Sequence, residues 1–172
     1  MPQLIKDGAV SDDNWTLVRD GEAALPASPV IVPLATWLAK RDELLKRDDV
    51  GVWLSPAEDP ALLAGDAATL PLIAVDFPKF ADGRGYSIGR LLRERFSFKG
   101  ELRAVGDVAR DQLYYLHQVG FDAFLLRDGK DAQDALASLR DFTDGYQVTN
   151  RRTPWFRRSD TDLPVRHRGA TE

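Results

Sequence analysis

The sequence has no cysteine, only two histidines and a single methionine. Without cysteine the chain can form no disulfide, no thiolate nucleophile, no cysteine-ligated zinc site and no ordinary iron–sulfur cluster. Two histidines, His117 and His167, are too few for a multi-histidine metal centre. We therefore expect no metal site and no cofactor.

The sequence also lacks a long uncharged apolar run. No stretch approaches the roughly 20 apolar residues that a membrane-spanning helix needs. The first 20 residues carry charges throughout and contain no apolar core of a secretory signal. We expect a cytoplasmic protein that does not contact a membrane.

Positive charge is scarce outside the C-terminal tail. The formal net charge is -4. Residues 151–172 hold six arginines against three carboxylates, a net +3, which leaves -7 for the first 150 residues. Because an acidic body repels phosphate backbones, we expect no nucleic-acid partner.

What the sequence does contain is a rhythm of short apolar runs and helical stripes. The composition, 44% hydrophobic and 29% charged, is typical of a folded domain. Candidate strands are centred near residues 31, 52, 74, 104 and 125, with helical patterns between them. This alternation predicts an α/β fold with a mainly parallel sheet of about five strands and flanking helices, either open or a half-barrel βα repeat.

The N-terminal residues predict a small antiparallel hairpin. Asp7-Gly8 lies between two short apolar runs, which favours a two-residue turn. Residues 15–18 are a further candidate strand in this antiparallel element. We expect one α/β domain over residues 1–144, with the hairpin in about the first 20, and a basic, partly disordered tail over residues 145–172.

The loop and helix start after the third predicted strand are rich in glycine and arginine. This segment leaves the carboxyl end of a parallel strand, where α/β proteins gather ligands. Glycine amides and a helix start at Ser87 would donate to an anion, with basic side chains beside them. The predicted anion- or partner-binding residues are Lys79, Asp82, Gly83, Arg84, Gly85, Ser87 and Arg90.

The alternative for this segment is a plain turn and helix start with solvated arginines. The glycine spacing fits neither the dinucleotide fingerprint nor a P-loop. If the site exists, we expect Asp82 to hold Arg84 or Arg90 in place rather than to act as a base.

Asp76 and Asp107 each follow a predicted strand at the same edge of the sheet. Paired carboxylates there could bind magnesium or share acid–base work, so both are catalytic candidates. The alternatives are a loop carboxylate at Asp76 and a helix cap at Asp107.

Aromatic side chains stand between arginine pairs in the C-terminal tail. Interfaces are enriched in aromatic residues and arginine, which favours a docking motif for an acidic partner. The alternative is that these side chains pack back onto the acidic body. The residues concerned are Arg151, Arg152, Trp155, Phe156 and Arg157.

Three stretches together resemble a known bacterial family. They are residues 77–90 (FPKFADGRGYSIGR), 100–116 (GELRAVGDVARDQLYYL) and 120–124 (GFDAF). These stretches are similar to those of the domain of unknown function 934 family, whose members are commonly encoded beside an assimilatory sulfite reductase. The resemblance covers the chain to about residue 144 and implies a role in sulfur assimilation, as a helper of sulfite reduction.

Two functions remain open at this point. The first is a non-catalytic accessory protein that docks on sulfite reductase, because a chain without cysteine has no dithiol or cluster for carrying electrons. The second is a small α/β enzyme that acts on an anionic metabolite, either a sulfur oxyanion or a phosphorylated compound.

Overall fold

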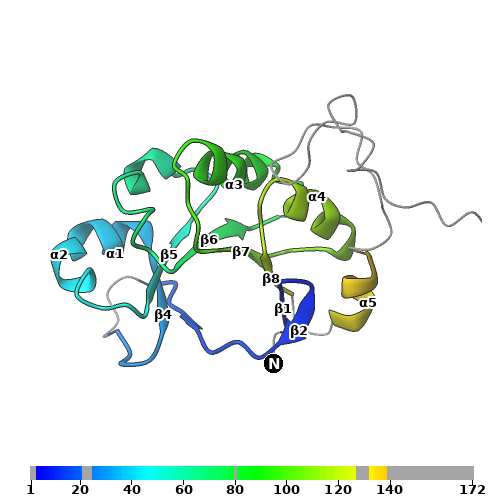
Figure 1. The fold of residues 1–172 in the computed structure, drawn as a ribbon, viewed down its shortest axis with the longest axis horizontal. Helices are drawn as coiled ribbons and strands as arrows, with labels where there is room; N and C mark the ends of the chain where they lie inside the picture. Colours follow the sequence, from blue (N-terminus) through cyan, green and yellow to red (C-terminus); the bar gives the residue numbers. More distant parts are fainter. Residues whose placement is uncertain (1–2, 21–24, 80, 127–131, 139–172) are drawn as a thin grey trace, which may run out of the picture.

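The computed structural model describes residues 3–20, 25–79, 81–126 and 132–138. Within these ranges the chain forms a single eight-stranded sheet with the strand order β2-β1-β8-β7-β6-β5-β4-β3 (Figure 1). The strands are β1 (Leu4–Lys6), β2 (Ala9–Ser11), β3 (Thr16–Leu17), β4 (Val30–Pro33), β5 (Val50–Leu54), β6 (Leu72–Phe77), β7 (Glu101–Gly106) and β8 (Ala123–Leu125). Strands β3 to β8 run parallel in sequence order, whereas β1 is antiparallel to both β8 and β2.

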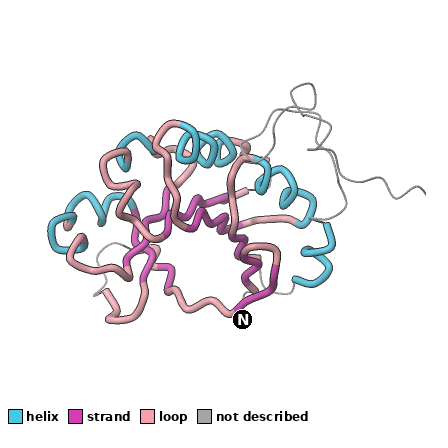
Figure 2. Tube along the Cα trace, viewed as in Figure 1, coloured by secondary structure: helices cyan, strands magenta, loops and turns pink. Residues whose placement is uncertain are grey.

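Helices occupy one side of this sheet. They are α1 (Leu34–Ala39), α2 (Arg41–Leu44), η1 (Pro60–Leu63), α3 (Arg84–Glu94), η2 (Arg110–Gln112), α4 (Leu113–Gln118) and α5 (Ala132–Ser138). Right-handed crossovers between strands that follow one another in the same direction place every crossover on the same face. Figure 2 shows the result, a curved half-barrel with the helices outside the arc of strands. No helix among the described residues is long and apolar enough to cross a bilayer.

The five predicted central strands are confirmed as β4 to β8. The count of about five was too low, because the hairpin and residues 16–17 join the same sheet. The hairpin pairs with β8 at one edge, and β3 pairs with β4 at the other. The prediction that residues 15–18 belong to an antiparallel element was wrong, since β3 pairs parallel to β4.

The predicted turn at Asp7-Gly8 is confirmed. Asp7 and Gly8 have φ angles of 50° and 76°, the left-handed pair that a two-residue hairpin turn requires. The turn sets the register in which Lys6 lies opposite Ala9.

The two faces of the sheet differ in what covers them. The outer face packs against the helices and carries the main core, including Val52, Val75 and Phe124. The inner face carries a smaller cluster, Ile31, Leu72, Ala74 and Val105, with Trp15, Leu17, Trp53 and Leu125 packed against it. The chain between β2 and β3 runs across the open side of the curved sheet (Figure 1).

Two helix starts differ from the sequence prediction. Helix α3 begins at Arg84, so Ser87 lies inside its first turn instead of opening it. The reason is local: the Asp82 carboxylate accepts the Arg84 N–H at 3.2 Å and starts the helix early. The helical segment after β7 begins at Arg110 with Ala109 as its N-cap, so Asp107 is not the helix cap.

Candidate functional site

The carboxyl ends of the parallel strands meet at one edge of the sheet, where α/β folds bind ligands. Asp76 and Asp107 both lie there. Asp76 is opposite Val105 in the β6–β7 ladder, and Asp107 directly follows β7. The Asp107 N–H donates to the Phe77 carbonyl at 2.7 Å, which joins the two strand ends. Asp76 is not a loop carboxylate, since it lies within β6 and is only 8% exposed.

Arg19 is a candidate that the sequence analysis missed. It lies two residues beyond β3, at the same carboxyl edge, and reaches across two strands to Asp76. Its Nη1 and Nη2 contact Asp76 Oδ1 at 3.3 and 3.2 Å. Because 57 residues separate Arg19 from Asp76 in the sequence, no local sequence pattern predicts their contact.

The indole ring of Trp53 packs against the guanidinium of Arg19. The guanidinium carbon of Arg19 lies 5.6 Å from the centre of the indole ring, within cation–π range. The Trp53 Nε1–H donates to the Val18 carbonyl at 2.8 Å, which fixes the ring against the residue before Arg19. The arrangement is an arginine stacked on an aromatic ring and tethered by a carboxylate.

Gly106 shapes the floor beside Asp76. Its φ is +98°, and a Cβ at this position would lie 2.5 Å from the Phe77 carbonyl oxygen and 2.9 Å from Asp76 Oδ1. Only glycine tolerates both the backbone conformation and the close approach. The end of β7 is therefore built around the Asp76 carboxylate.

The predicted anion-binding segment is divided between a turn and the start of α3. Asp82 accepts hydrogen bonds from Nε and Nη2 of Arg84 at 2.9 and 2.7 Å, so it holds this arginine in place. The hydrogen bonds lower the pKa of Asp82 and raise the pKa of Arg84. Arg90 pairs instead with Glu94, one turn further along the helix. Lys79 is exposed, and its charge also lowers the pKa of Asp82.

Helix α3 separates these residues into two faces. Arg84, Ser87 and Arg90 lie on one exposed stripe, as spacings of three residues place them on a helix. Gly85 and Gly89 lie on the buried face, where Cβ atoms would come within 2.5 Å of the Phe77 ring and 2.3 Å of the Phe121 ring. The structure thus gives Gly85 a packing role, while Gly83 is exposed with open space at its Cα. Anion binding by this segment stays a prediction.

A buried ion-pair network crosses the inner face. Arg103 is 1% exposed, and its Nε donates to Glu101 at 2.7 Å while its Nη1 donates to both Asp13 oxygens at 2.8 and 2.9 Å. Lys6 Nζ lies 2.8 Å from the second Glu101 oxygen, and this contact raises the pKa of Lys6. The two cations and two carboxylates neutralise one another and hold the chain before β3 over the sheet. The sequence analysis did not predict this network; the available sequence signal was the alternation of polar and apolar residues in β7, which places Glu101 and Arg103 on the same face of the sheet.

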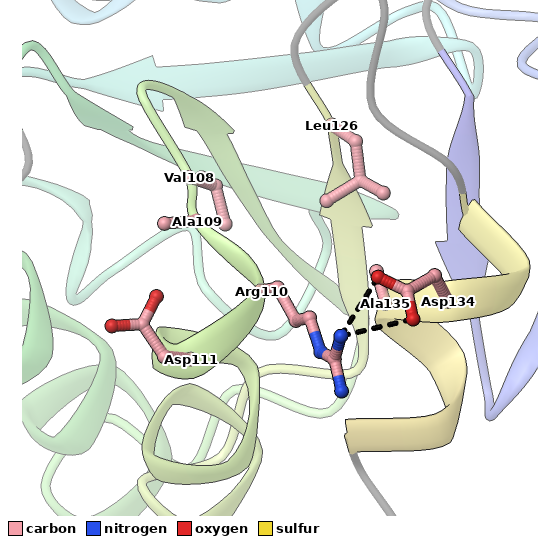
Figure 3. Close-up of a pocket in the computed structure, with 7 residues that line it drawn as sticks. All are labelled: Val108, Ala109, Arg110, Asp111, Leu126, Asp134 and Ala135. Atoms are coloured by element: carbon pink, nitrogen blue, oxygen red, sulfur yellow. Dashed lines mark hydrogen bonds and ion pairs between the residues drawn. The ribbon is translucent and has the colours of Figure 1, made fainter.

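A cavity of about 220 Å³ lies between the loop after β7, the end of β8 and α5 (Figure 3). Val108, Leu126 and Ala135 form its apolar wall, and Arg110 Nη1 donates to both Asp134 oxygens at 2.9 and 2.8 Å. Ligand pockets usually span roughly 300–1,000 Å³, so this volume suits only a small group. The sequence analysis did not single out its lining.

Within the described ranges, no three side chains of the kinds that ligate metals gather at one place. The tail residues predicted to dock a partner, Arg151 to Arg157, lie outside the described residues.

Comparison with known proteins gave one match. Residues 51–156 match the model of a family described as "Bacterial protein of unknown function (DUF934)". The matched stretch includes Asp76, Gly106 and the whole of α3. No curated protein and no solved structure matches the chain.

Proposed function

The chain belongs to the DUF934 family of bacterial proteins, and from that premise we propose that it is a non-catalytic accessory protein of sulfur assimilation that docks on sulfite reductase. Family membership supports this role because members of the family are commonly encoded beside an assimilatory sulfite reductase. The chain itself, without cysteine, offers no dithiol or cluster for passing electrons to sulfite. A partner of the reductase fits these residues better than a second reductase.

The exposed stripe of α3 is the observation that carries this proposal. Arg84, Ser87, Arg90 and Leu91 are all exposed on a helix whose opposite face is fixed to the sheet by glycine contacts. Interfaces are enriched in arginine and use rigid elements to present it. Both arginines are already tethered by neighbouring carboxylates, which limits their freedom before a partner arrives. These features of the stripe favour docking onto a flat acidic surface of a partner protein over binding of a small ligand in an enclosed site.

A binding measurement between the full chain and a bacterial assimilatory sulfite reductase tests the proposal. We expect a complex with a dissociation constant of about 1 μM or tighter. The double variant Arg84→Glu/Arg90→Glu should weaken it by at least about tenfold, because charge reversal on the stripe repels an acidic partner. Circular dichroism of the variant checks that α3 remains folded.

A matched control reverses two cations elsewhere. Lys40→Glu/Lys46→Glu makes the same change in net charge beside α2, away from α3, and should leave the affinity unchanged. Absence of a complex, or equal weakening by both double variants, would contradict docking through α3.

A small α/β enzyme acting on an anionic metabolite is the second candidate, and the cavity beside α5 favours it. Arg110, Asp111 and Asp134 bring a cation and two carboxylates to its lining. A thermal-shift screen with sulfite, sulfate, phosphate and sugar phosphates tests this function, since a bound ligand raises apparent stability. A stabilisation that disappears in Arg110→Gln would support the enzyme, and no stabilisation by any of these compounds would count against it.

A further inference from the structure

The guanidinium of Arg19 contacts its carboxylate through other nitrogens than Arg47 and Arg84 do. Arg47 and Arg84 each grip a carboxylate with Nε and Nη2, the flat edge that matches two oxygens. Arg19 contacts Asp76 only through its two terminal nitrogens. Nη2 carries a second N–H on the side of Nε, and the structure gives Asp76 as the only described hydrogen-bond partner of this guanidinium, so Nε–H and that second N–H remain for another acceptor.

This free edge is open to solvent and held in place. The Arg19 side chain is 52% exposed, although its tip is tethered by a carboxylate that is itself almost buried. The guanidinium lies over the Trp53 ring, which helps to hold it in place, and the Trp53 hydrogen bond to the Val18 carbonyl fixes the ring. An arginine that is already ordered loses little rotamer freedom when it binds.

The position is also the one at which such folds bind ligands. Arg19 lies at the carboxyl edge of β3, and its partner Asp76 is at the carboxyl end of the central strand β6. Asp76 faces inward, as do Ala74 and Leu72 two and four residues before it. The site thus lies at the mouth of the half-barrel, on the face opposite the α3 stripe.

We propose that Arg19, stacked on Trp53 and tethered by Asp76, binds a small oxyanion such as phosphate, sulfate or sulfite. The anion accepts two parallel hydrogen bonds from Nε and Nη2 of Arg19. Asp76 serves as a positioning residue that holds the guanidinium, and Gly106 leaves room for its carboxylate. The inference does not depend on the proposed docking function, because it uses no residue of α3.

NMR titration of the full chain with inorganic phosphate, sulfate and sulfite, against chloride at equal ionic strength, tests this site. The Nε–H resonance of Arg19, assigned by its disappearance in Arg19→Lys, should shift and saturate with a dissociation constant on the order of 1 mM. Arg19→Lys keeps the positive charge but loses the flat edge; followed through the Trp53 Nε1–H resonance, which lies beside the site in every variant, its anion binding should be about tenfold weaker. A resonance that does not move with any of the three anions would overturn the proposal.

Two further variants separate this site from the others. Arg84→Gln and Arg110→Gln remove the exposed arginines of α3 and of the α5 cavity, and each should leave the anion affinity of Arg19 unchanged. If binding is lost in either of them but retained in Arg19→Lys, the anion binds elsewhere and the inference fails. Either result leaves the measurement of reductase binding unaffected, so the two proposals fail independently.

Discussion

Gly106 shows at the scale of one residue how the edge of the sheet is constrained. Its left-handed φ of +98° turns the chain from β7 toward Asp107, and its missing Cβ leaves space for Asp76 and for the Phe77 carbonyl. A side chain would meet strain in the backbone and overlap in space together. The Arg19–Asp76 pair depends on this turn.

Replacing this glycine gives the prediction for the residue scale. Gly106→Ala should lower the free energy of unfolding by about 2 kcal/mol or more, from left-handed strain and the contact at 2.5 Å. Gly65→Ala is the control, because Gly65 has open space and no left-handed φ, and it should change stability by less than about 1 kcal/mol. Urea unfolding of both variants measures the difference, and equal effects would contradict this role of Gly106.

Helix α3 shows at the scale of an element how glycine spacing sets a helix against a sheet. Gly85 and Gly89 are one turn apart, and each receives an aromatic ring, Phe77 from β6 or Phe121 before β8. The close approach buries one face of α3 and leaves the arginine stripe outside. This packing gives a structural reason for Gly85, one of the two glycines that the sequence analysis assigned to anion or partner binding.

A substitution in α3 tests whether close packing outweighs helix propensity. Gly89→Ala adds a better helix former, yet its Cβ would lie 2.3 Å from the Phe121 ring, so we expect a loss of about 1–3 kcal/mol. Ser87→Ala on the exposed stripe should change stability by less than about 0.5 kcal/mol. Thermal unfolding of the two variants measures these changes in stability. A Gly89→Ala variant that is more stable than the original chain would show that α3 lies further from the Phe121 ring.

The segment between β2 and β3 is held by its contact with β7. Asp13→Ala removes one of the two carboxylates that neutralise the buried Arg103, so we expect a loss of about 3 kcal/mol. Asp12→Ala, at an exposed neighbour, should cost less than about 0.5 kcal/mol. Denaturant unfolding compares the two, and similar stabilities would mean that the network does not hold this segment.

The five central strands were predictable because each is a short apolar run between turn signals, and the Asp7-Gly8 turn has a local chemical cause. The pairing of β3 was not predictable in this way, since its partner β4 is chosen by contacts across the fold. The predicted start of α3 was three residues too late, because the N-cap is a glycine, Gly83, and the stretch around it resembles a loop in sequence.

At the scale of the whole molecule, the N-terminal segment completes the half-barrel. It covers both edges of the parallel sheet, supplies Asp13 to the inner face and brings Arg19 to Asp76. The sequence analysis placed Asp76 at the correct edge, but Arg19 and Trp53 come close to it only after four strands, β3 to β6, are aligned. A site assembled from residues 19, 53 and 76 has no signature at any fixed spacing.

The acid stability of the molecule depends on carboxylates paired in the fold. Asp66 is buried and accepts hydrogen bonds from Arg41 and from Trp37 Nε1, which hold its pKa below the ordinary value. A lowered pKa stabilises the fold above the unfolded value of about 3.9, and this contribution disappears as the pH falls through the folded pKa. We expect the free energy of unfolding to fall steeply below about pH 4.

The variant Asp66→Asn should lower stability at neutral pH and flatten the acid limb of the profile. Asp59→Asn, at an exposed N-cap whose carboxylate accepts only the Ala61 N–H, serves as the comparison. Urea unfolding between pH 3 and pH 7 measures both, and an acid limb as steep in Asp66→Asn as in the original chain would contradict the account.

The central claim is that this protein assists sulfite reduction, and the growth of a deletion strain tests it most directly. The strain lacks this chain and grows with either sulfate or cysteine as its only sulfur source. The account predicts slow growth on sulfate, normal growth on cysteine, and rescue by the original chain but not by Arg84→Glu/Arg90→Glu. Equal growth of the deletion and parent strains on sulfate would contradict it.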